Sequence, residues 1–539
     1  MNRRHDLIAV FVLGLFGVPL LLPLLELRSP GSWAAWAEAD RIAELIGTTL
    51  GLCALVLVLA GPAGIALAVL LYRTDLPCRV VLRSALAVGL FVPLPLFALA
   101  WQAVGGGGWR PWTHGVLWAA LVHAAAALPW VVWLTGLGLR RVEPELEEDA
   151  LTAMPAARVL WHVSLRRASP AIGLAAVWVV LQAAGEITVT DLGVVRTFAE
   201  EVYTQFVTAG SDALGRAVAV SIPATLLTVL AVAALTRRWE GRLTVLATPR
   251  PALVFRLGRA RWPAAAGVLV TLAAYAGIPL VSLLRQAGGG EAFTVTRLGL
   301  ELKRAVHLQI GMVLDSLAWS AAAGVLAAGL ALLASWAAAD SRGFRGLLFV
   351  LAVALWAVPG PVLGFGLKAT IERLMDLEDV LLAWTTVRPL KAGLYELSTP
   401  VPVLWAHVAR LFPYAVAFIW PAVRDVPRDL REAARVDGAG PWGEFRRVIW
   451  PAARGAVWLA AVAVTALALG ELGASKLVQV PGRQTFAQEL FNQMHYAATA
   501  TTAALALVQL ALALLVVGLF RLVARDILSS DTHPTRRRL

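Results

Sequence analysis

The sequence predicts an all-α membrane protein with about twelve transmembrane helices, arranged as two parallel repeats of six helices. Three observations predict this fold. First, the 539 residues are 59% hydrophobic and only 15% charged, whereas soluble domains average about 45–50% and about 25%. Second, a mean hydropathy of +0.72 reflects apolar runs of about 20 residues, long enough to cross a hydrocarbon core of about 30 Å. Third, matching residues recur between the two halves. The composition excludes disorder and argues against a soluble enzyme.

Twelve apolar runs are long enough to act as spans. They lie near 7–26, 43–71, 82–104, 115–139, 169–190, 213–235, 263–284, 311–339, 345–367, 400–422, 452–475 and 497–522. With a cytoplasmic N-terminus, loops and tails on the cytoplasmic side hold 31 of the 47 Lys and Arg residues, and those on the other side hold 15. Positive residues are retained in the cytoplasm. We therefore expect both termini there, and we attribute the net charge of +12 to topology rather than to nucleic-acid binding.

The first run has an alternative interpretation as a cleaved signal peptide, because Ala37-Glu38-Ala39 resembles a cleavage site. Residues 7–25 form too long an apolar stretch for that, and the small residues lie too far beyond it. An uncleaved first span is favoured. The two cysteines, Cys53 in an apolar run and Cys78 in a short loop, predict neither a disulfide framework nor a metal cluster.

The chain divides into three predicted segments. Residues 1–235 and 263–539 each hold about six spans, and residues 236–262 join them. The joining segment has no apolar run long enough to cross, and it holds seven arginines: Arg237, Arg238, Arg242, Arg250, Arg256, Arg259 and Arg261. We interpret it as a cytoplasmic linker that contacts anionic lipid head groups.

The halves match at nearly constant offset. Five pairs lie 284 residues apart: His123 with His407, Pro129 with Pro413, Leu146 with Leu430, Glu148 with Glu432 and Ala150 with Ala434. Gly185-Glu186 matches Gly470-Glu471 at 285, and Thr197-Phe198-Ala199-x-Glu201 matches Thr485-Phe486-Ala487-x-Glu489 at 288. An even number of spans returns the chain to its starting side, so both halves insert with the same orientation. Parallel repeats are related by an axis along the membrane normal, with a pathway between them.

A charged segment follows the fourth span of each half. The second copy runs from Glu432 to Pro451. Residues 432–436 favour a helix, Gly438 permits the left-handed residue that ends it, and Pro441 suits the first position of the next helix. The sequence predicts a helix–turn–helix on the cytoplasmic side.

This segment resembles the signature of the integral membrane permeases of bacterial ABC importers: Glu-Ala-Ala, three residues, Gly, nine residues, then hydrophobic, any, hydrophobic and Pro. The matching positions are Glu432, Ala433, Ala434, Gly438, Val448, Trp450 and Pro451. The resemblance implies a coupling helix that docks in a cleft of a separate ATPase subunit and transmits its ATP-driven closure to the spans. The fused two-half arrangement, over essentially the whole chain, looks most like the iron(III) and thiamine importer permeases.

The first copy of the motif is degenerate. Glu148-Asp149-Ala150 stands for Glu-Ala-Ala, Met154 occupies the Gly position, and Arg166 replaces the final Pro after a one-residue deletion that aligns Val163 and Leu165. Pro155 can still start the second helix. We expect a second docking element whose turn geometry differs, so that the two cytoplasmic surfaces are unequal.

The sequence shows no catalytic or metal motif. None of the four lysines follows a Gly, which excludes a Gly-Lys-Ser/Thr phosphate loop, and no His-x-x-x-His pair occurs. We therefore expect no enzyme activity and no bound cofactor, with ATP hydrolysed by a partner subunit. Polar residues near span ends are substrate-path candidates because charge within a membrane is costly: Gln182, Glu186, Thr188, Thr190, Glu471, Ser475 and Lys476.

Two further features concern helix geometry and packing. Pro93, Pro95, Pro359 and Pro361 are expected to kink the third and ninth spans. His123 and His407 are expected to be packing or hydrogen-bonding residues within paired spans.

These expectations combine into an ABC importer permease of the bacterial inner membrane. Its expected partners are two cytoplasmic ATPase subunits, an extracytoplasmic solute-binding protein and the lipid bilayer. The expected substrate is a small solute, with iron(III) ranked before thiamine and another small ion or metabolite left open. The alternative is an ion-coupled secondary transporter, because twelve spans in two parallel halves also fit that class. Nearly charge-free central spans argue against it.

Overall fold

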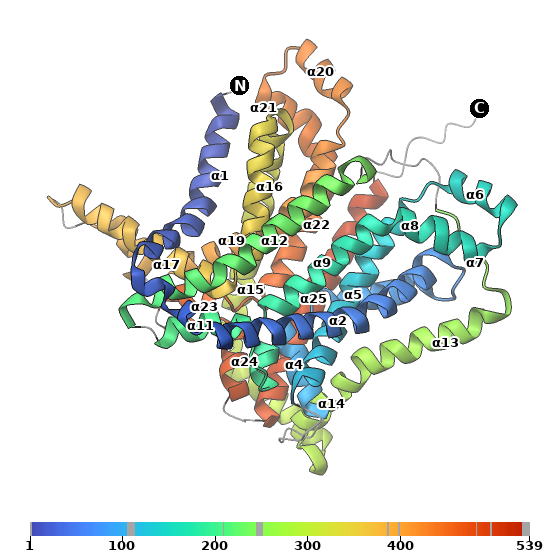
Figure 1. Ribbon diagram of the computed structural model, residues 1–539, viewed down its shortest axis with the longest axis horizontal. Helices are drawn as coiled ribbons and strands as arrows, with labels where there is room; N and C mark the ends of the chain where they lie inside the picture. The colour runs from blue at the N-terminus through green and yellow to red at the C-terminus, as the bar shows by residue number, and fades with distance from the viewer. Residues whose placement is uncertain are drawn as a thin grey trace.

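The computed structural model describes residues 3–104, 114–208, 210–243, 252–384, 387–396, 399–480, 482–495 and 499–530. Within these ranges the chain is almost entirely helical and has no strand; a single isolated parallel bridge joins Thr74 to Phe255. The expected all-α membrane fold is confirmed. Figure 1 shows helices of both halves crossing in one bundle, with α6 and α20 projecting from it.

The helices of the first half are α1 (Arg3–Leu21), α2 (Ala39–Arg73), α3 (Arg79–Gly89), α4 (Leu94–Val104), α5 (Val116–Arg140), α6 (Pro144–Ala153), α7 (Ala156–Val159), α8 (Leu165–Arg167), α9 (Ser169–Gly185), α10 (Thr188–Leu192), α11 (Phe198–Thr208) and α12 (Ala213–Leu243). The 3-10 helices Leu22–Arg28 and Pro30–Ala37 follow α1, and a π-helical turn, Leu160–Ser164, joins α7 to α8.

The helices of the second half are α13 (Arg261–Leu272), α14 (Ile278–Ala287), α15 (Val295–Asp340), α16 (Arg342–Ala357), α17 (Gly360–Leu381), α18 (Pro389–Lys391), α19 (Val401–Arg424), α20 (Arg428–Val436), α21 (Pro441–Glu444), α22 (Trp450–Ala468), α23 (Ser475–Val478), α24 (Phe486–His495) and α25 (Thr499–Ser530). Two π-helical turns, Ala273–Gly277 and Phe445–Ile449, join α13 to α14 and α21 to α22.

Among the described residues, nine helices are long and apolar enough to cross a membrane, or twelve if each of three bent helix pairs is one span. The bends are 101° between α3 and α4, 66° before α9, and 113° between α16 and α17. Pro93 and Pro359 lie at the first and third bends. The kinks expected there are therefore complete breaks, since proline removes a backbone donor and disfavours a helical residue before it.

Two spans end earlier than their apolar runs suggest. The run 169–190 is helical only to Gly185, and the run 452–475 only to Ala468. In each case a glutamate follows, Glu186 or Glu471, and its backbone leaves the α-helix before a short helix begins.

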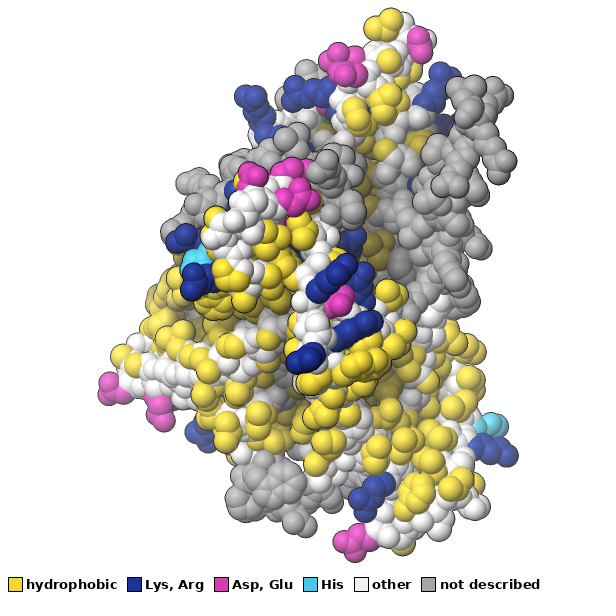
Figure 2. Space-filling model, turned by 90° about the vertical axis from the view of Figure 1, so that its right-hand side faces the viewer, with side chains coloured by type: hydrophobic (Ala, Val, Ile, Leu, Met, Phe, Trp, Pro, Cys, Tyr) yellow, Lys and Arg dark blue, Asp and Glu magenta, His cyan; other side chains and the backbone are white. Residues whose placement is uncertain are grey.

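Apolar side chains cover much of the outside of the bundle. Val10 on α1, Val58 on α2, Leu227 on α12 and Val270 on α13 are all exposed. Figure 2 shows hydrophobic side chains over much of one face, with Lys, Arg, Asp and Glu gathered in separate groups. Such large apolar surfaces are stable against lipid rather than water.

The two halves repeat the same internal contacts. Phe198 N donates to Thr49 Oγ1 at 2.9 Å in the first half, and Phe486 N donates to Ser316 Oγ at 2.8 Å in the second. Gln205 Nε2 likewise donates to Glu201 Oε1 at 2.6 Å, and Gln493 Nε2 to Glu489 Oε1 at 2.8 Å. The sequence repeat is therefore a structural repeat.

The halves exchange their first spans. Helix α1 lies against α15, α16 and α17 of the second half. Phe16 packs on Phe412 with ring centroids 4.5 Å apart, and Trp405 Nε1 donates to Leu15 O at 3.1 Å. In return, α13 and the π turn after it pack on the first half, where Tyr275 lies 5.5 Å from the Phe97 ring. Each half therefore completes its core with a helix from the other.

The predicted linker 236–262 is partly structured. Its first residues extend α12 to Leu243, and residues 244–251 lie outside the described part of the chain. Beyond them, Phe255 is buried and exchanges backbone hydrogen bonds with the loop after α2: Phe255 N donates to Arg73 O at 2.8 Å, and Asp75 N to Phe255 O at 3.2 Å. This end of the linker is therefore anchored to the first half.

Candidate functional site: two loops and a central cavity

The segment 428–451, called loop 2, forms the expected helix–turn–helix. Helix α20 ends at Val436, and Gly438 has a φ of +79°. Gly438 N donates to Arg435 O at 3.0 Å and Ala439 N to Ala434 O at 2.9 Å. This paired pattern is the glycine-terminated helix end in which a left-handed residue satisfies the last carbonyls. Pro441 then opens α21.

Loop 2 presents apolar side chains outside the core. Val436 is 86% exposed and Trp442 is 53% exposed, and Glu432, Ala433 and Gly438 are exposed beside them. Of the remaining motif residues, Ala434, Pro441 and Val448 are half-buried, and Trp450 and Pro451 are exposed at the start of α22. The loop thus combines a glycine-terminated turn with an exposed apolar surface, which is typical of a protein-docking element.

The segment 144–167, called loop 1, reaches a similar shape by a different turn. Helix α6 ends at Ala153, and Met154 is extended, with a φ of −147° and a ψ of 154°. Pro155 is the residue before α7. Glu148, Asp149 and Pro155 are exposed and Ala150 is half-buried. A second helix does follow, but no left-handed glycine ends the first one.

A salt bridge links the two ends of loop 1. Arg167 Nη2 lies 2.5 Å from Glu143 Oε1, and Arg167 Nε donates to Glu143 Oε2 at 3.2 Å. These hydrogen bonds hold the pKa of the Glu143 carboxyl below its usual value. Both loops also contain a π-helical turn in the second arm, Leu160–Ser164 and Phe445–Ile449, 285 residues apart. Such turns are rare and occur often at functional sites.

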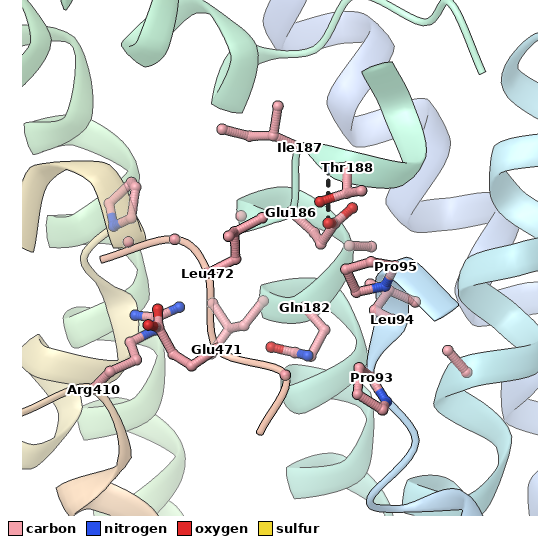
Figure 3. Close-up of a pocket in the computed structure, with 18 of the residues that line it drawn as sticks. Pro93, Leu94, Pro95, Gln182, Glu186, Ile187, Thr188, Arg410, Glu471 and Leu472 are labelled. Atoms are coloured by element: carbon pink, nitrogen blue, oxygen red, sulfur yellow. Dashed lines mark hydrogen bonds between the residues drawn. The ribbon is translucent and has the colours of Figure 1, made fainter. Parts of the chain in front are cut away.

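A cavity of about 810 Å³ lies between the two halves. Its wall includes the breaks at Pro93 and Pro359, the ends of α9 and α16, α19, and the segment 470–477. Of the predicted substrate-path residues, the cavity wall includes Gln182, Glu186, Thr188, Glu471 and Lys476. Figure 3 shows Gln182 and Glu186 from the first half on one side of the cavity and Arg410 and Glu471 from the second half on the other, with the Glu186 carboxylate turned toward Thr188.

Glu186 and Glu471 have the same local role in the two halves. Each carboxylate accepts two backbone N–H groups at the start of the short helix that follows. Thr188 N and Val189 N donate to Glu186 at 2.8 and 2.9 Å, and Ala474 N and Ser475 N donate to Glu471 at 2.8 and 3.1 Å. His123 Nε2 lies 4.0 Å from Glu186, and His407 Nε2 lies 3.8 Å from Glu471.

Three of the remaining candidates support these turns or the wall beside them. Thr190 is fully buried, and its hydroxyl donates to Ile187 O at 3.0 Å, so it faces away from the cavity. Ser475 is buried, and its hydroxyl donates to Glu471 O at 3.1 Å. Lys476 Nζ lies 4.8 Å from the centroid of the Phe491 ring. The sequence candidates are thus close together, but the side chains of four of them, Glu186, Thr190, Glu471 and Ser475, hydrogen-bond to the backbone.

Sequence reasoning missed the residues that fill the cavity wall. Arg410 Nη1 donates to Leu355 O, Trp356 O and Val358 O at 3.1, 3.3 and 2.7 Å, and so satisfies the end of α16 at its break. The sequence signal for Arg410 was its position near the middle of the predicted span 400–422, because charged residues within a span are costly and usually functional.

An aromatic group also lines the cavity. Trp130 on α5 stacks on Trp178 with centroids 4.5 Å apart and lies 6.1 Å from the ring of Tyr414 on α19. Trp130 and Tyr414 are 284 residues apart, the offset of the repeat. The matched offset could have identified this pair.

The chain is similar to one described family and to two curated permease proteins. Residues 310–529 match the family described as "Binding-protein-dependent transport system inner membrane component". The chain is 28% identical over 281 residues to the thiamine transport system permease protein ThiP of Brucella suis biovar 1, covering 49% of this chain and 47% of ThiP. It is 38% identical over 68 residues to the diacetylchitobiose uptake system permease protein NgcG of Streptomyces coelicolor, covering 13% of this chain and 22% of NgcG. The chain therefore spans about half and about a fifth of the length of these curated relatives.

Proposed function

We propose that the chain is a membrane permease subunit of an ABC importer in the bacterial inner membrane, because residues 310–529 match the family of binding-protein-dependent transport inner membrane components. Both termini face the cytoplasm in this proposal. A solute-binding protein delivers a small solute from outside, and the solute crosses between the two halves by alternating access.

The observation that carries the proposal is the pair of helix–turn–helix loops. Loop 1 and loop 2 occupy repeat-equivalent positions, and each exposes apolar side chains: Trp161 in loop 1 and Val436 and Trp442 in loop 2. Each loop docks one cytoplasmic ATPase subunit, which hydrolyses ATP. The permease itself needs no cofactor.

The substrate is iron(III) or thiamine in this proposal, and two observations favour thiamine. The Brucella suis relative carries thiamine transport in its name. The cavity wall offers the rings of Trp130, Trp178 and Tyr414, which suit a planar organic cation through stacking and cation–π attraction. Uptake of labelled thiamine and of labelled iron(III) into cells that express the chain with its transport partners separates the two.

The experiment that tests the importer function measures ATP hydrolysis by the chain reconstituted with its candidate ATPase subunit, together with pull-down of that subunit. Glu432→Lys reverses a charge on the docking face, and Gly438→Asp places a branched residue at a φ of +79°. We expect both variants to lose docking and coupled hydrolysis while they remain folded.

The alternative, an ion-coupled secondary transporter, makes the opposite prediction. The wild-type chain would bind no ATPase, and liposome uptake would follow an imposed proton or sodium gradient. Glu186 and Glu471 would then be the coupling residues. Their carboxylates already accept two backbone N–H groups each, so no structural observation favours this alternative.

A further inference from the structure

In each half, three residues connect the loop (loop 1 or loop 2) to the end of a long span. The first, called node 1, consists of Arg73, Glu147 and Ser164. Arg73 is the last residue of α2, and its guanidinium donates to Glu147 on α6 and, at 2.9 Å, to Leu139 O. Ser164 Oγ donates to the other Glu147 oxygen at 2.5 Å. All three side chains are fully buried.

The second connection, called node 2, consists of Asp340, Arg431 and Glu444. Asp340 is the last residue of α15. Arg431 on α20 donates to Asp340 at 2.8 Å and to Glu444 Oε1 at 2.5 Å. Arg435 Nε also donates to Glu444, at 2.8 Å. Node 2 therefore joins the end of a span, the first helix of loop 2 and its second helix, as node 1 does in loop 1.

The two nodes occupy equivalent positions with opposite charges. Glu147 and Arg431 lie 284 residues apart, the offset of the loop motifs. Arg73 and Asp340 lie 267 apart, the same offset as Thr49 and Ser316, whose hydroxyls accept equivalent backbone N–H groups. The span carries the cation in the first half and the anion in the second. Both halves therefore have an ion pair between the loop and the end of the span, with the two charges exchanged.

The spans that hold the nodes lead to the cavity. Helix α2 packs along α5, which carries Trp130, and α15 packs along α19, which carries Tyr414. Besides its own chain ends, loop 2 contacts α15 through aromatic rings, since Phe445 and Trp442 lie 4.8 and 6.3 Å from Trp336. An ion pair to α15 adds a connection to a helix that loop 2 does not continue into.

We propose that nodes 1 and 2 are positioning elements that transmit displacement of each loop to α2 and α15, and that the ion pair serves this link with either polarity. The inference rests on the proposed function. An ATPase that moves loop 2 would pull Asp340 through Arg431, and so would move α15 against the first half. Arg431 and Asp340 touch no substrate in this scheme.

The test uses node 2, because its residues are partly exposed and a variant there can fold. Spin labels are placed at Leu50→Cys on α2 and Leu314→Cys on α15, both exposed positions, in a chain that carries Cys53→Ala and Cys78→Ser. The full chain is reconstituted with its candidate ATPase subunit, and the label-to-label distance is measured by double electron–electron resonance with and without ATP and vanadate.

Three variants are compared with the labelled wild type. Asp340→Asn removes the anion, and we expect the ATP-dependent distance change to fall about threefold or more while pull-down of the ATPase is retained. The triple variant Asp340→Arg, Arg431→Glu and Glu444→Gln installs the polarity of node 1 without placing a second carboxylate against Glu444, and we expect it to restore the change. Arg342→Gln, an exposed cation two residues from Asp340, is the matched control and should leave the change intact.

Each other outcome has a defined meaning. A full distance change in Asp340→Asn overturns the proposal, and so does loss of ATPase binding in that variant, because node 2 would then only shape the docking face. Failure of the triple variant to restore the change also overturns it, since the ion pair between Asp340 and Arg431 would not be the link. If the wild type binds no ATPase, it is the proposed function that fails.

Discussion

Gly438 shows how one residue decides the shape of loop 2. Its φ of +79° lies in the region that L-residues with a Cβ occupy at a cost of about 1–2 kcal/mol. A Cβ there would meet no atom within 4 Å. The requirement is therefore one of backbone conformation and not of space, which is why the sequence alone identified it.

Gly438→Ala is predicted to weaken ATPase docking. It destabilises the turn by about 1 kcal/mol, so global stability falls only slightly. Pull-down of the ATPase subunit and thermal unfolding in detergent check both parts. Gly440→Ala is the matched control, because Gly440 lies in the same loop with a φ of −66° and open space around it. Equal docking by the two variants would show that the left-handed turn is not required.

The pair of Arg73 and Glu147 is the most buried ion pair of the described residues, with neither side chain exposed. Removing one member of a buried pair leaves an uncompensated charge, which costs about 3–5 kcal/mol. The pair of Arg431 and Asp340 is partly solvated, at 12% and 30% exposed, so the same loss is smaller there.

Glu147→Gln is predicted to destabilise the chain by about 3–5 kcal/mol, and Asp340→Asn by about 1 kcal/mol or less. The measurement is the unfolding midpoint in detergent at constant pH. Asp149→Asn, an exposed change on the same helix, should shift stability by less than about 0.5 kcal/mol. A Glu147→Gln midpoint equal to that of Asp149→Asn would mean that the Arg73 charge finds another partner.

At the scale of elements, the two Gly-Glu turns end their spans and start short helices. The glutamates accept the first N–H groups of α10 and α23, which helix starts leave without partners. The close approach of the halves also depends on this segment, because a Cβ on Gly470 would lie 2.6 Å from Pro93. These turns therefore shape the cavity wall.

Glu186→Gln and Glu471→Gln are predicted to retain uptake and to lose about 0.5–2 kcal/mol of stability each, since an amide has one acceptor oxygen where the carboxylate has two. Uptake into liposomes and thermal unfolding are the measurements. Lys476→Met removes a charge from the same wall without removing a carboxylate cap, and is the control. Abolished uptake at unchanged stability would assign the carboxylates to ion coupling.

At the scale of the whole molecule, the exchange of first spans ties the halves together. Phe16 of α1 is fully buried with Phe412 of α19, and Tyr275 after α13 is buried in the core of the first half. Each half alone would expose the surface that the other half's first span covers. The linker is therefore not the sole connection between them.

A chain cut between residues 247 and 248 and produced as two polypeptides is predicted to assemble, with the fragments recovered together on affinity purification. Removing residues 1–28 from the first fragment takes away α1 and should reduce recovery strongly. Loss of a buried Phe side chain, such as that of Phe16, costs about 3–5 kcal/mol. Recovery that does not depend on residues 1–28 would show that α1 adds little to assembly.

The sequence by itself determined the all-α membrane fold, the repeat of the two halves and the turn at Gly438; it predicted twelve spans, and the described residues hold nine to twelve candidates. Those features depend on local properties: run length, periodic offset and backbone conformation at single residues. The proline positions marked where spans are interrupted, though not that Pro93 and Pro359 separate helices bent by 101° and 113°.

Tertiary structure alone decided which helix covers which core, where the cavity lies, and that Arg410, Trp130 and Tyr414 line it. It also revealed that Arg73 and Asp340 hold the two loops with opposite charges. The physical reason is that lipid-facing and core-facing helices are equally apolar. Composition therefore identifies a span but not its neighbours, and partners are set by side-chain packing and ion pairs between residues far apart in the sequence.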